Sequence, residues 1–326
     1  MRAAVVVEAG KAPIYDHFQE PVPTADHVRV SVSAAALSNV VKSRASGKHY
    51  SSSENLQFVV GIDGVGRLDD GRRVYFALPK APFGSMSERT LVPFSQCVML
   101  PDGLDDVTAA ALANPGMSAW AALSERARLA PGETVLVNGA TGTAGRLAVQ
   151  IAKYMGAKKV IATGRNTYAL EALLTLGADV TIPLGSANSQ GEDEFEDALQ
   201  SQFHGGIDVV LDYLGGASAE RVIIAGAKAG REAVPIRFVQ IGSVSGPNIT
   251  LPSAALRSSA IELMGSGIGS IPMDRLIKSV EQWMQAAVTA GFAIATKVFP
   301  LSEVEKVWGT AGNSPRAVFQ IPSPPA

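Results

Sequence analysis

The stretch from Thr134 to Lys153 is typical of an apolar strand, a turn with glycines at 139, 142 and 145, and an amphipathic helix. A pyrophosphate group needs this order of elements. The first glycine permits a tight turn, the second lets the backbone approach the phosphates, and the third lets the helix pack on its strand. The stretch therefore predicts a site for a nicotinamide or flavin dinucleotide. The candidate contacts are Asn138, Gly139, Thr141, Gly142, Thr143, Ala144 and Gly145.

Two alternatives apply to this motif. Glycines at this spacing also occur in a tight strand-to-helix turn that binds nothing. A phosphate loop of the nucleotide-hydrolase type is excluded, because Gly145 is followed by Arg146 and Leu147 instead of a Lys-Ser or Lys-Thr pair. The apolar residues on both sides of the turn favour the dinucleotide interpretation.

The end of the next strand, Val160–Thr163, discriminates between cofactors. An acidic side chain at this point would accept hydrogen bonds from a ribose 2′-hydroxyl and repel a 2′-phosphate. The sequence instead has Gly164, Arg165 and Asn166, so a guanidinium is offered where a phosphate would lie. These three residues predict NADPH. The alternative is that Arg165 is a solvated surface residue.

The elements around this stretch follow two patterns. Residues 1–114 show short strands with period-2 alternation, such as Val28, Val30 and Val32, which predicts a compact antiparallel barrel. Helices are expected at Asp105–Leu112 and Pro115–Leu129, with Pro115 in the first turn of the second.

Beyond Gly132 the chain alternates strand and helix, which predicts a doubly wound parallel sheet with right-handed crossovers. Glycines at 156, 177 and 230 stand where helix ends favour positive φ. The expected strands are Val135–Asn138, Val160–Thr163, Val180–Ile182, Ile207–Asp212, Phe238–Ile241 and Ile261–Gly265. The expected helices are Thr143–Met155, Tyr168–Leu176, Glu194–Phe203, Ala217–Ala227 and, after the sheet, Met273–Ala290.

Composition narrows the function classes. The 326 residues are 47% hydrophobic and 18% charged, with a net charge of −2, which indicates a globular chain without the basic field that nucleic acid binding needs. Cys97 is the only cysteine, so an intrachain disulfide is excluded and a reducing cytoplasm is expected. No leader or membrane-spanning segment is predicted.

The order of barrel, nucleotide fold and return to the barrel resembles the medium-chain dehydrogenase/reductase superfamily, in its zinc-independent quinone oxidoreductase branch. The resemblance covers essentially the whole length and rests on motifs in the same order: RAAVVVEAG, LSNVVKSRASGKHY, GIDGVGRL, NPGMSAWAAL, VLVNGATGTAGRLAVQIAKYMGA, IDVVLDYLGG, FVQIGSVSG and PLSEVEKV. It implies a GroES-like barrel domain over 1–114, a Rossmann NADPH-binding domain over 115–271, and a return segment over 272–326.

The resemblance also implies what the site lacks. Zinc-dependent relatives place a cysteine where this chain has Ser38, and read Gly-His-Glu where it has Gly61, Ile62 and Asp63. Zinc needs three or four thiolate, imidazole or carboxylate ligands. The four histidines, at positions 17, 27, 49 and 204, suggest no such set, so no metal is expected.

Further roles follow from the resemblance. Close relatives often have a lysine at the position of Tyr168, so either Arg165 takes over the phosphate contact or the affinity for NADPH is weaker. Tyr50 matches a proton-donating tyrosine of enoyl-reductase relatives, with Lys42 nearby as a second candidate catalytic residue. The alternative is that Tyr50 is a loop tyrosine that only shapes the entrance of the pocket. A homodimer is expected through the last strand of the nucleotide sheet, at Ala260–Gly265. The alternative is a monomer in which the helix Met273–Ala290 covers that strand. Additional cofactor contacts are expected at Tyr213, Leu214, Gly215, Gly242, Ser243, Gly265, Ser266 and Gly267.

These observations predict an NADPH-dependent reductase of quinones or α,β-unsaturated carbonyls. Without a metal, hydride can be delivered only to an acceptor that is already electrophilic. One alternative is an enoyl-thioester reductase, which a preference for acyl-thioesters would reveal. The other is a non-catalytic NADPH-binding sensor or interaction protein, which would not turn over NADPH with simple quinones.

Overall fold

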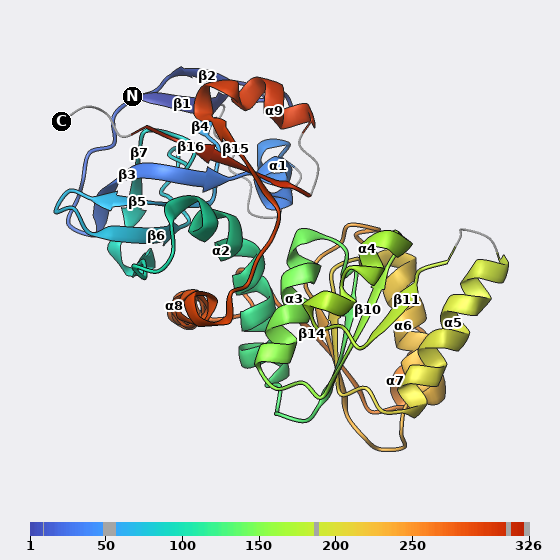
Figure 1. Cartoon of the computed structure of the whole chain (residues 1–326). Helices are drawn as coiled ribbons and strands as arrows, with labels where there is room; N and C mark the ends of the chain where they lie inside the picture. Colours follow the sequence, from blue (N-terminus) through green and yellow to red (C-terminus); the bar gives the residue numbers. More distant parts are fainter. Residues whose placement is uncertain (9, 48–56, 186–188, 311–313, 323–326) are drawn as a thin grey trace. The chain divides into compact units, whose positions relative to one another are not determined.

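The computed structural model of the chain describes residues 1–8, 10–47, 57–185, 189–310 and 314–322. The chain folds into two compact units (Figure 1). The first unit comprises Met1–Asn114 and Ile277–Ala326, and the second comprises Pro115–Leu276.

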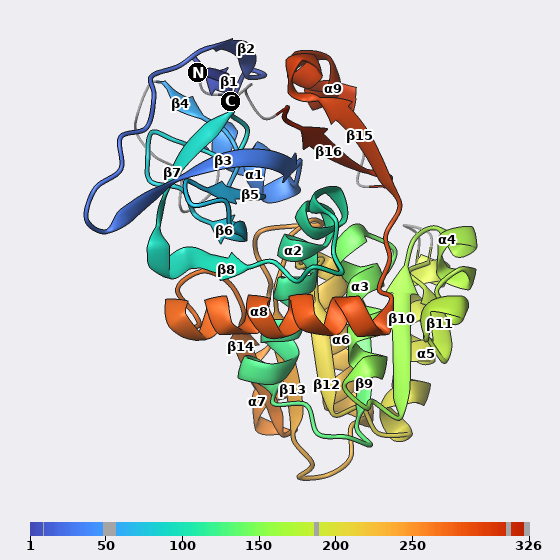
Figure 2. The ribbon, with the colours of Figure 1, turned by 60° about the vertical axis from the view of Figure 1, so that its left-hand side comes forward.

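The first unit is built from antiparallel sheets. Its larger sheet has the order β15-β16-β3-β5-β6-β8, with β7 also paired to β3, and its smaller sheet has the order β2-β1-β4 (Figure 2). In the described parts of this unit, only β15 and β16 pair in parallel. The strands are β1 (Arg2–Val6), β2 (Ile14–His17), β3 (His27–Ala36), β4 (Phe58–Val59), β5 (Asp63–Leu68), β6 (Arg73–Ala77), β7 (Arg89–Pro93), β8 (Cys97–Met99), β15 (Thr296–Pro300) and β16 (Arg316–Gln320).

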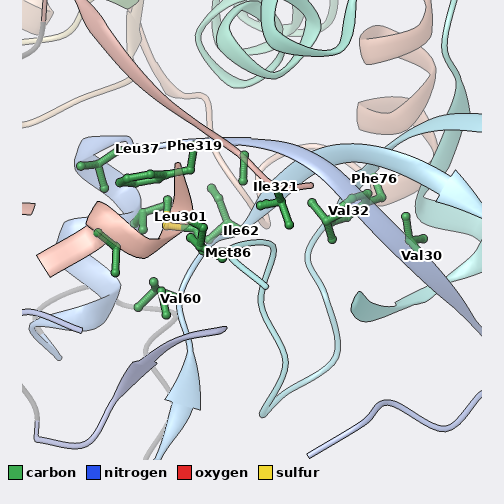
Figure 3. Close-up of a cluster of buried hydrophobic side chains, with 14 of the residues drawn as sticks. Val30, Val32, Leu37, Val60, Ile62, Phe76, Met86, Leu301, Phe319 and Ile321 are labelled. Atoms are coloured by element: carbon green, nitrogen blue, oxygen red, sulfur yellow. The ribbon is translucent and has the colours of Figure 1, made fainter. Parts of the chain in front are cut away.

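The helices of the first unit are α1 (Asn39–Ala45), α2 (Asp106–Ala121), α8 (Met273–Ala290) and α9 (Val304–Thr310). Helix α2 continues into the second unit, and α8 begins in the second unit. The buried core of the first unit contains residues from the amino-terminal part of the chain and from the return segment. Val30 and Val32 of β3 are buried, as the period-2 pattern predicts, and they lie in one cluster with Phe319 and Ile321 from the return segment (Figure 3).

The second unit is a doubly wound parallel sheet with strand order β11-β10-β9-β12-β13-β14. Its strands are β9 (Thr134–Asn138), β10 (Lys159–Gly164), β11 (Val180–Pro183), β12 (Val209–Asp212), β13 (Ile236–Gln240) and β14 (Ile261–Gly265). Its helices are α3 (Thr143–Tyr154), α4 (Thr167–Glu171), α5 (Ser189–His204), α6 (Gly216–Ala229) and α7 (Ser253–Arg257). Helix α3 covers one face of the sheet, and α5 and α6 cover the other (Figure 1). The fold class predicted from the sequence is confirmed.

The prediction that Pro115 begins a new helix is wrong. Helix α2 runs through Pro115 and is followed by a π-helical turn, Ala122–Ala127. A proline inside a helix costs about 3 kcal/mol, because it removes one backbone hydrogen bond. The turns on both sides of Pro115 contain fully buried alanines, such as Ala111 and Ala119, and this packing offsets the local cost.

The prediction of positive φ is right for Gly156 and Gly177, at +93° and +106°, and wrong for Gly230, whose φ is −66°. Glycine is needed at position 230 for a different reason. A Cβ atom there would lie 2.5 Å from the Gly226 carbonyl oxygen and 2.9 Å from Cδ1 of Ile236, so the position has no room for a side chain.

None of the helices in the described parts of the chain has the length and apolar character needed to cross a bilayer.

Candidate cofactor site

The strand order of the second unit fixes where a ligand can bind. The direction of winding reverses between β9 and β12, which are neighbours in the sheet although other strands separate them in sequence. Ligands of open α/β sheets bind at the carboxyl ends of the strands at such a reversal. The glycine turn follows β9, so it lies at this switch point.

The three glycines of the turn differ in their surroundings. Gly139 has a φ of +90°, which the tight turn requires. A Cβ on Gly145 would lie 2.6 Å from the Ala140 Cα, so this glycine lets α3 pack against the turn. A Cβ on Gly142 would meet nothing nearer than the Gly139 carbonyl oxygen at 3.9 Å. Packing within the described chain therefore leaves open space in front of Gly142.

The amino end of α3 suits an anion. Its N-cap residue is Gly142, which has no side chain to accept hydrogen bonds from the first amides, and the first turn contains no acidic residue. The amides of a first helical turn and the helix dipole favour negative charge at this position. Arg146 adds a cation, because its Nε donates to the Thr141 carbonyl oxygen at 3.1 Å and holds the guanidinium against the turn. Arg146 was not predicted as a site residue, although a cation in the first turn after the glycines would have pointed to it.

The end of β10 carries the residues predicted to select the cofactor. Gly164 is buried, and a Cβ there would lie 2.5 Å from Cγ2 of Thr141, so this site excludes an acidic side chain by packing. Arg165 is exposed. The Asn166 side chain caps α4, with Oδ1 accepting from the Ala169 amide at 2.9 Å. Tyr168 is 82% exposed.

The remaining predicted contacts lie in the loops after β12, β13 and β14, at the same carboxyl ends of the strands as the glycine turn. Leu214 packs on the glycine turn, since its side chain lies 2.8 Å from where a Gly139 Cβ would be. Gly215 pairs with Gly246 in an isolated bridge, and Gly242 lies against the Tyr213 backbone. Ser243, Gly265 and Gly267 are exposed, whereas Ser266 is half-buried and its amide donates to the Gln240 carbonyl oxygen at 2.9 Å.

Asn138 lies beneath the turn and is fully buried. Its Nδ2 donates to Oδ1 of Asp212 at 2.7 Å, and its Oδ1 accepts from the Thr163 hydroxyl at 2.6 Å. The Ser218 hydroxyl lies 3.0 Å from Nδ2 and 3.2 Å from Oδ1. Asn138, Thr163, Asp212 and Ser218 together form a polar cluster. The residue types alone did not reveal it, because three of its members belong to different strands.

Burial shifts the acidities of two residues at this edge. The pKa of Asp212 is raised because burial disfavours the carboxylate, although hydrogen bonds from Asn138, Gly215 and Leu214 act in the opposite direction. Burial also raises the pKa of the Tyr213 phenol, with a smaller opposing effect from Ser118. Both shifts reflect a water-poor environment under the loops.

The predicted catalytic residues belong to the first unit. Lys42 lies in α1, half-buried, and this burial lowers its pKa. Tyr50 lies outside the described residues, as does His49.

The positions that match zinc ligands in relatives are occupied in ways that do not suit a metal. The Ser38 hydroxyl caps α1 by accepting from the Val41 amide at 3.3 Å, and Ile62 belongs to the buried core of the first unit. Asp63 is buried and accepts from the Tyr75 hydroxyl at 3.2 Å. Among the residues that the structure describes, no three His, Cys, Asp or Glu side chains form a group that could hold a metal ion. Zinc does not fit this set.

Comparisons with known proteins agree with the fold. The family described as zinc-binding dehydrogenase matches residues 144–286. A probable NADPH-dependent quinone reductase of Emericella nidulans is 30% identical over an alignment that covers 99% of this chain and all of that protein. A 2-methylene-furan-3-one reductase of Solanum lycopersicum is 35% identical and matches 61% of this chain and 52% of its own length.

Solved structures extend the match to the whole fold. The quinone oxidoreductase of Thermus thermophilus, whose structure was also determined with NADPH, superposes with a TM-score of 0.81 at 26% identity. The superposition covers 98% of this chain and all of that protein. Fold and site together thus define a nucleotide-dependent oxidoreductase. The chain belongs to the medium-chain dehydrogenase/reductase superfamily, in its quinone oxidoreductase branch.

Proposed function

We propose that this chain is a zinc-independent oxidoreductase that uses NADPH to reduce quinones or α,β-unsaturated carbonyls. The observation that carries the proposal is the uncapped amino end of α3, which faces open space at Gly142 beside an acid-free strand end. The relative from Emericella nidulans, named as an NADPH-dependent quinone reductase, and the quinone oxidoreductase of Thermus thermophilus, solved with NADPH, support it.

Different residues of the second unit would bind different parts of the cofactor. The turn at Gly139–Gly145 and the first amides of α3 would bind the pyrophosphate, with Arg146 as a counter-charge. Arg165 would bind the 2′-phosphate, on the β10 side of the turn. The loops after β12, β13 and β14 lie on the other side of β9 in the strand order, so they would hold the nicotinamide half.

When bound, NADPH supplies the hydride. The chain offers Ser38 and Ile62 where zinc-dependent relatives have metal ligands, so no Lewis acid would polarise the acceptor. An acceptor that is electrophilic without such help is therefore required, and quinones and enones qualify. We assign Lys42 and Tyr50 as candidate proton donors. The Asn138 side chain would support the site without contacting the cofactor, because it is fully buried.

The second candidate function is enoyl-thioester reduction. A polyketide synthase subunit of Mycobacterium tuberculosis is 31% identical over 73% of this chain, which corresponds to 11% of that protein. An enoyl thioester leaves a basic enolate after hydride transfer, so a positioned acid should matter more there than with a quinone, by about 10²–10⁴-fold.

One experiment separates the two. Steady-state rates with NADPH would be measured on a quinone, a simple enone and an acyl-thioester, for the wild type and for Tyr50→Phe. We expect the quinone to be reduced best and to lose no more than a few-fold in the variant, with a larger loss for the enone. Preference for the thioester, with a severe loss in Tyr50→Phe, would favour the second function.

We further propose a homodimer in a reducing cytoplasm. Strand β14 is one of the two outer strands of its sheet, and Leu263 on it is 37% exposed. An outer strand with exposed apolar residues favours pairing with a second copy. Cys97 is the only cysteine of the chain and therefore has no intrachain disulfide partner, which is consistent with a reducing compartment.

A further inference from the structure

The polar cluster connects the loops that would hold the cofactor. Asp212 ends β12, and its carboxylate accepts hydrogen bonds from the Gly215 amide at 3.0 Å and the Leu214 amide at 3.2 Å, besides that from Asn138. The Asp212 carbonyl oxygen accepts from the amides of Ile241 at 2.8 Å and Gly242 at 3.1 Å. One residue therefore fixes the loops after β12 and β13.

Thr163 fixes the other side of the turn. Its hydroxyl donates to Oδ1 of Asn138 at 2.6 Å and accepts from the Gly139 amide at 3.2 Å, and its carbonyl oxygen accepts from the Ala140 amide at 2.8 Å. The same residue directly precedes Gly164 and Arg165. The strand end expected to bind the 2′-phosphate and the pyrophosphate turn are thereby joined through one side chain.

Three of the four members of the cluster are completely buried. Asn138, Thr163 and Asp212 are each 0% exposed. A buried carboxylate costs free energy unless it is hydrogen-bonded, and Asp212 accepts from one side-chain donor and two amides. A carboxylate is suited to this task because it accepts from several donors at once, whereas an amide side chain would bring a donor to the Leu214 and Gly215 amides.

We propose that Asn138, Thr163 and Asp212 are positioning residues that set the affinity for the cofactor by holding the loops after β9, β10, β12 and β13 in one arrangement. They act through Gly139, Gly215 and Gly242 and do not contact the cofactor. The proposal rests on the NADPH-binding function proposed above, and it gives three buried side chains an indirect effect on the affinity for the cofactor.

The test compares Asp212→Asn with Asp208→Asn. Asp208 directly precedes β12 and Asp212 is its last residue, and both accept hydrogen bonds from β9: Oδ2 of Asp208 from the Thr134 amide at 2.7 Å, and Oδ1 of Asp212 from Asn138. Asp208, however, lies at the opposite end of the strand from the cofactor loops. Dissociation constants for NADP⁺ would be measured by calorimetry, after circular dichroism has shown that each variant is folded. We expect Asp212→Asn to weaken binding about tenfold to 100-fold and Asp208→Asn to change it less than about threefold.

A second pair keeps the test valid if Asp212→Asn fails to fold. Thr163→Val removes the hydroxyl, whereas Thr163→Ser keeps it. We expect Thr163→Val to raise the KM for NADPH about tenfold with little change in the KM for the acceptor, and Thr163→Ser to restore it.

Three results would overturn the proposal. Binding of NADP⁺ by Asp212→Asn within about threefold of wild type would do so, and so would equal weakening in Asp208→Asn, which would indicate a general loss of stability. Failure of Thr163→Ser to restore the KM would do the same. If the wild type itself does not bind NADP⁺, the proposed function fails first, and the positioning role fails with it.

Discussion

At the scale of single residues, Arg165 is the side chain on which cofactor choice depends. It is exposed at the end of β10, and packing by Thr141 excludes an acid at the preceding Gly164. A charge-assisted contact to phosphate is worth roughly 1.5–3 kcal/mol. Arg165→Ala should therefore weaken NADPH binding by at least about tenfold while NADH binding changes little, as fluorescence titration would measure.

Arg146→Ala is the matched control, because Arg146 lies against the turn that would hold the pyrophosphate common to both cofactors. It should weaken NADPH and NADH alike. Wild-type protein that binds NADH as tightly as NADPH would refute the role of Arg165.

Because Asp63 is buried, we expect the free energy of unfolding to depend on pH. Burial raises its pKa from the usual 3.8 to about 6, against the opposing effects of Arg316 and the Tyr75 hydroxyl. The folded state therefore binds this proton more tightly than the unfolded state. Protonation of Asp63 therefore stabilises the folded state below about pH 4. This contribution to the free energy of unfolding, roughly 3 kcal/mol, is lost as the pH rises from about 4 to about 6.

The measurement is the free energy of unfolding from about pH 4 to pH 7 for the wild type and for Asp63→Asn. The variant lacks the titrating group, and it also leaves Arg316 without its nearby carboxylate, so its absolute stability is not the quantity of interest. The difference between the two proteins should change across this interval in favour of the variant. A difference that stays constant with pH would show that Asp63 ionises normally.

At the scale of elements, the strand, turn and helix from β9 to α3 could be predicted almost residue by residue. The reason is physical: a tight turn, a close approach and a helix packed on its strand each demand glycine at a fixed position. Short elements such as β2, α1 and α7 could not be predicted, because their few residues depend on tertiary contacts more than on local pattern.

The polar cluster illustrates the other limit. Asn138 was predicted as a cofactor contact from its place in the motif, and its full burial follows from partners 25 and 74 residues away in the sequence. Local spacing carries no information about such partners. The same holds for Pro115, where packing on both sides of the residue overrides its local preference.

We expect alanine substitutions at two glycines of the turn to differ in their effects on cofactor binding and on thermal stability. Gly142→Ala meets open space and has an ordinary φ of −75°, so it should leave thermal stability nearly unchanged and weaken NADPH binding, since the added methyl would point into the space for phosphate. Gly145→Ala should lower stability, by about 1–3 kcal/mol, because its methyl would overlap the turn. Melting curves and cofactor titrations on both variants test this.

The prediction fails if Gly142→Ala binds NADPH as tightly as wild type. Such a result would mean that the open space at the turn does not receive phosphate, and the alternative of a turn that binds nothing would then be favoured.

At the scale of the molecule, the dimer proposed through β14 predicts a solution mass of twice 33.9 kDa in sedimentation at micromolar concentration. Leu263→Asp should shift the protein toward the monomer, because it places a charge on the outer strand. Val298→Asp is the control, since Val298 is similarly exposed, at 45%, on β15, an outer strand of the larger sheet of the first unit. A wild-type mass near 33.9 kDa would contradict the dimer.

The proposed reaction of the whole protein is hydride transfer from NADPH to a quinone without zinc. The most direct measurement is the steady-state oxidation of NADPH with a small quinone, by protein whose zinc content has been determined and which has been treated with a chelator. We predict turnover that saturates with NADPH, far less than one zinc per chain and no effect of the chelator. Stoichiometric zinc with chelator-sensitive turnover, or no turnover with any quinone, would contradict it.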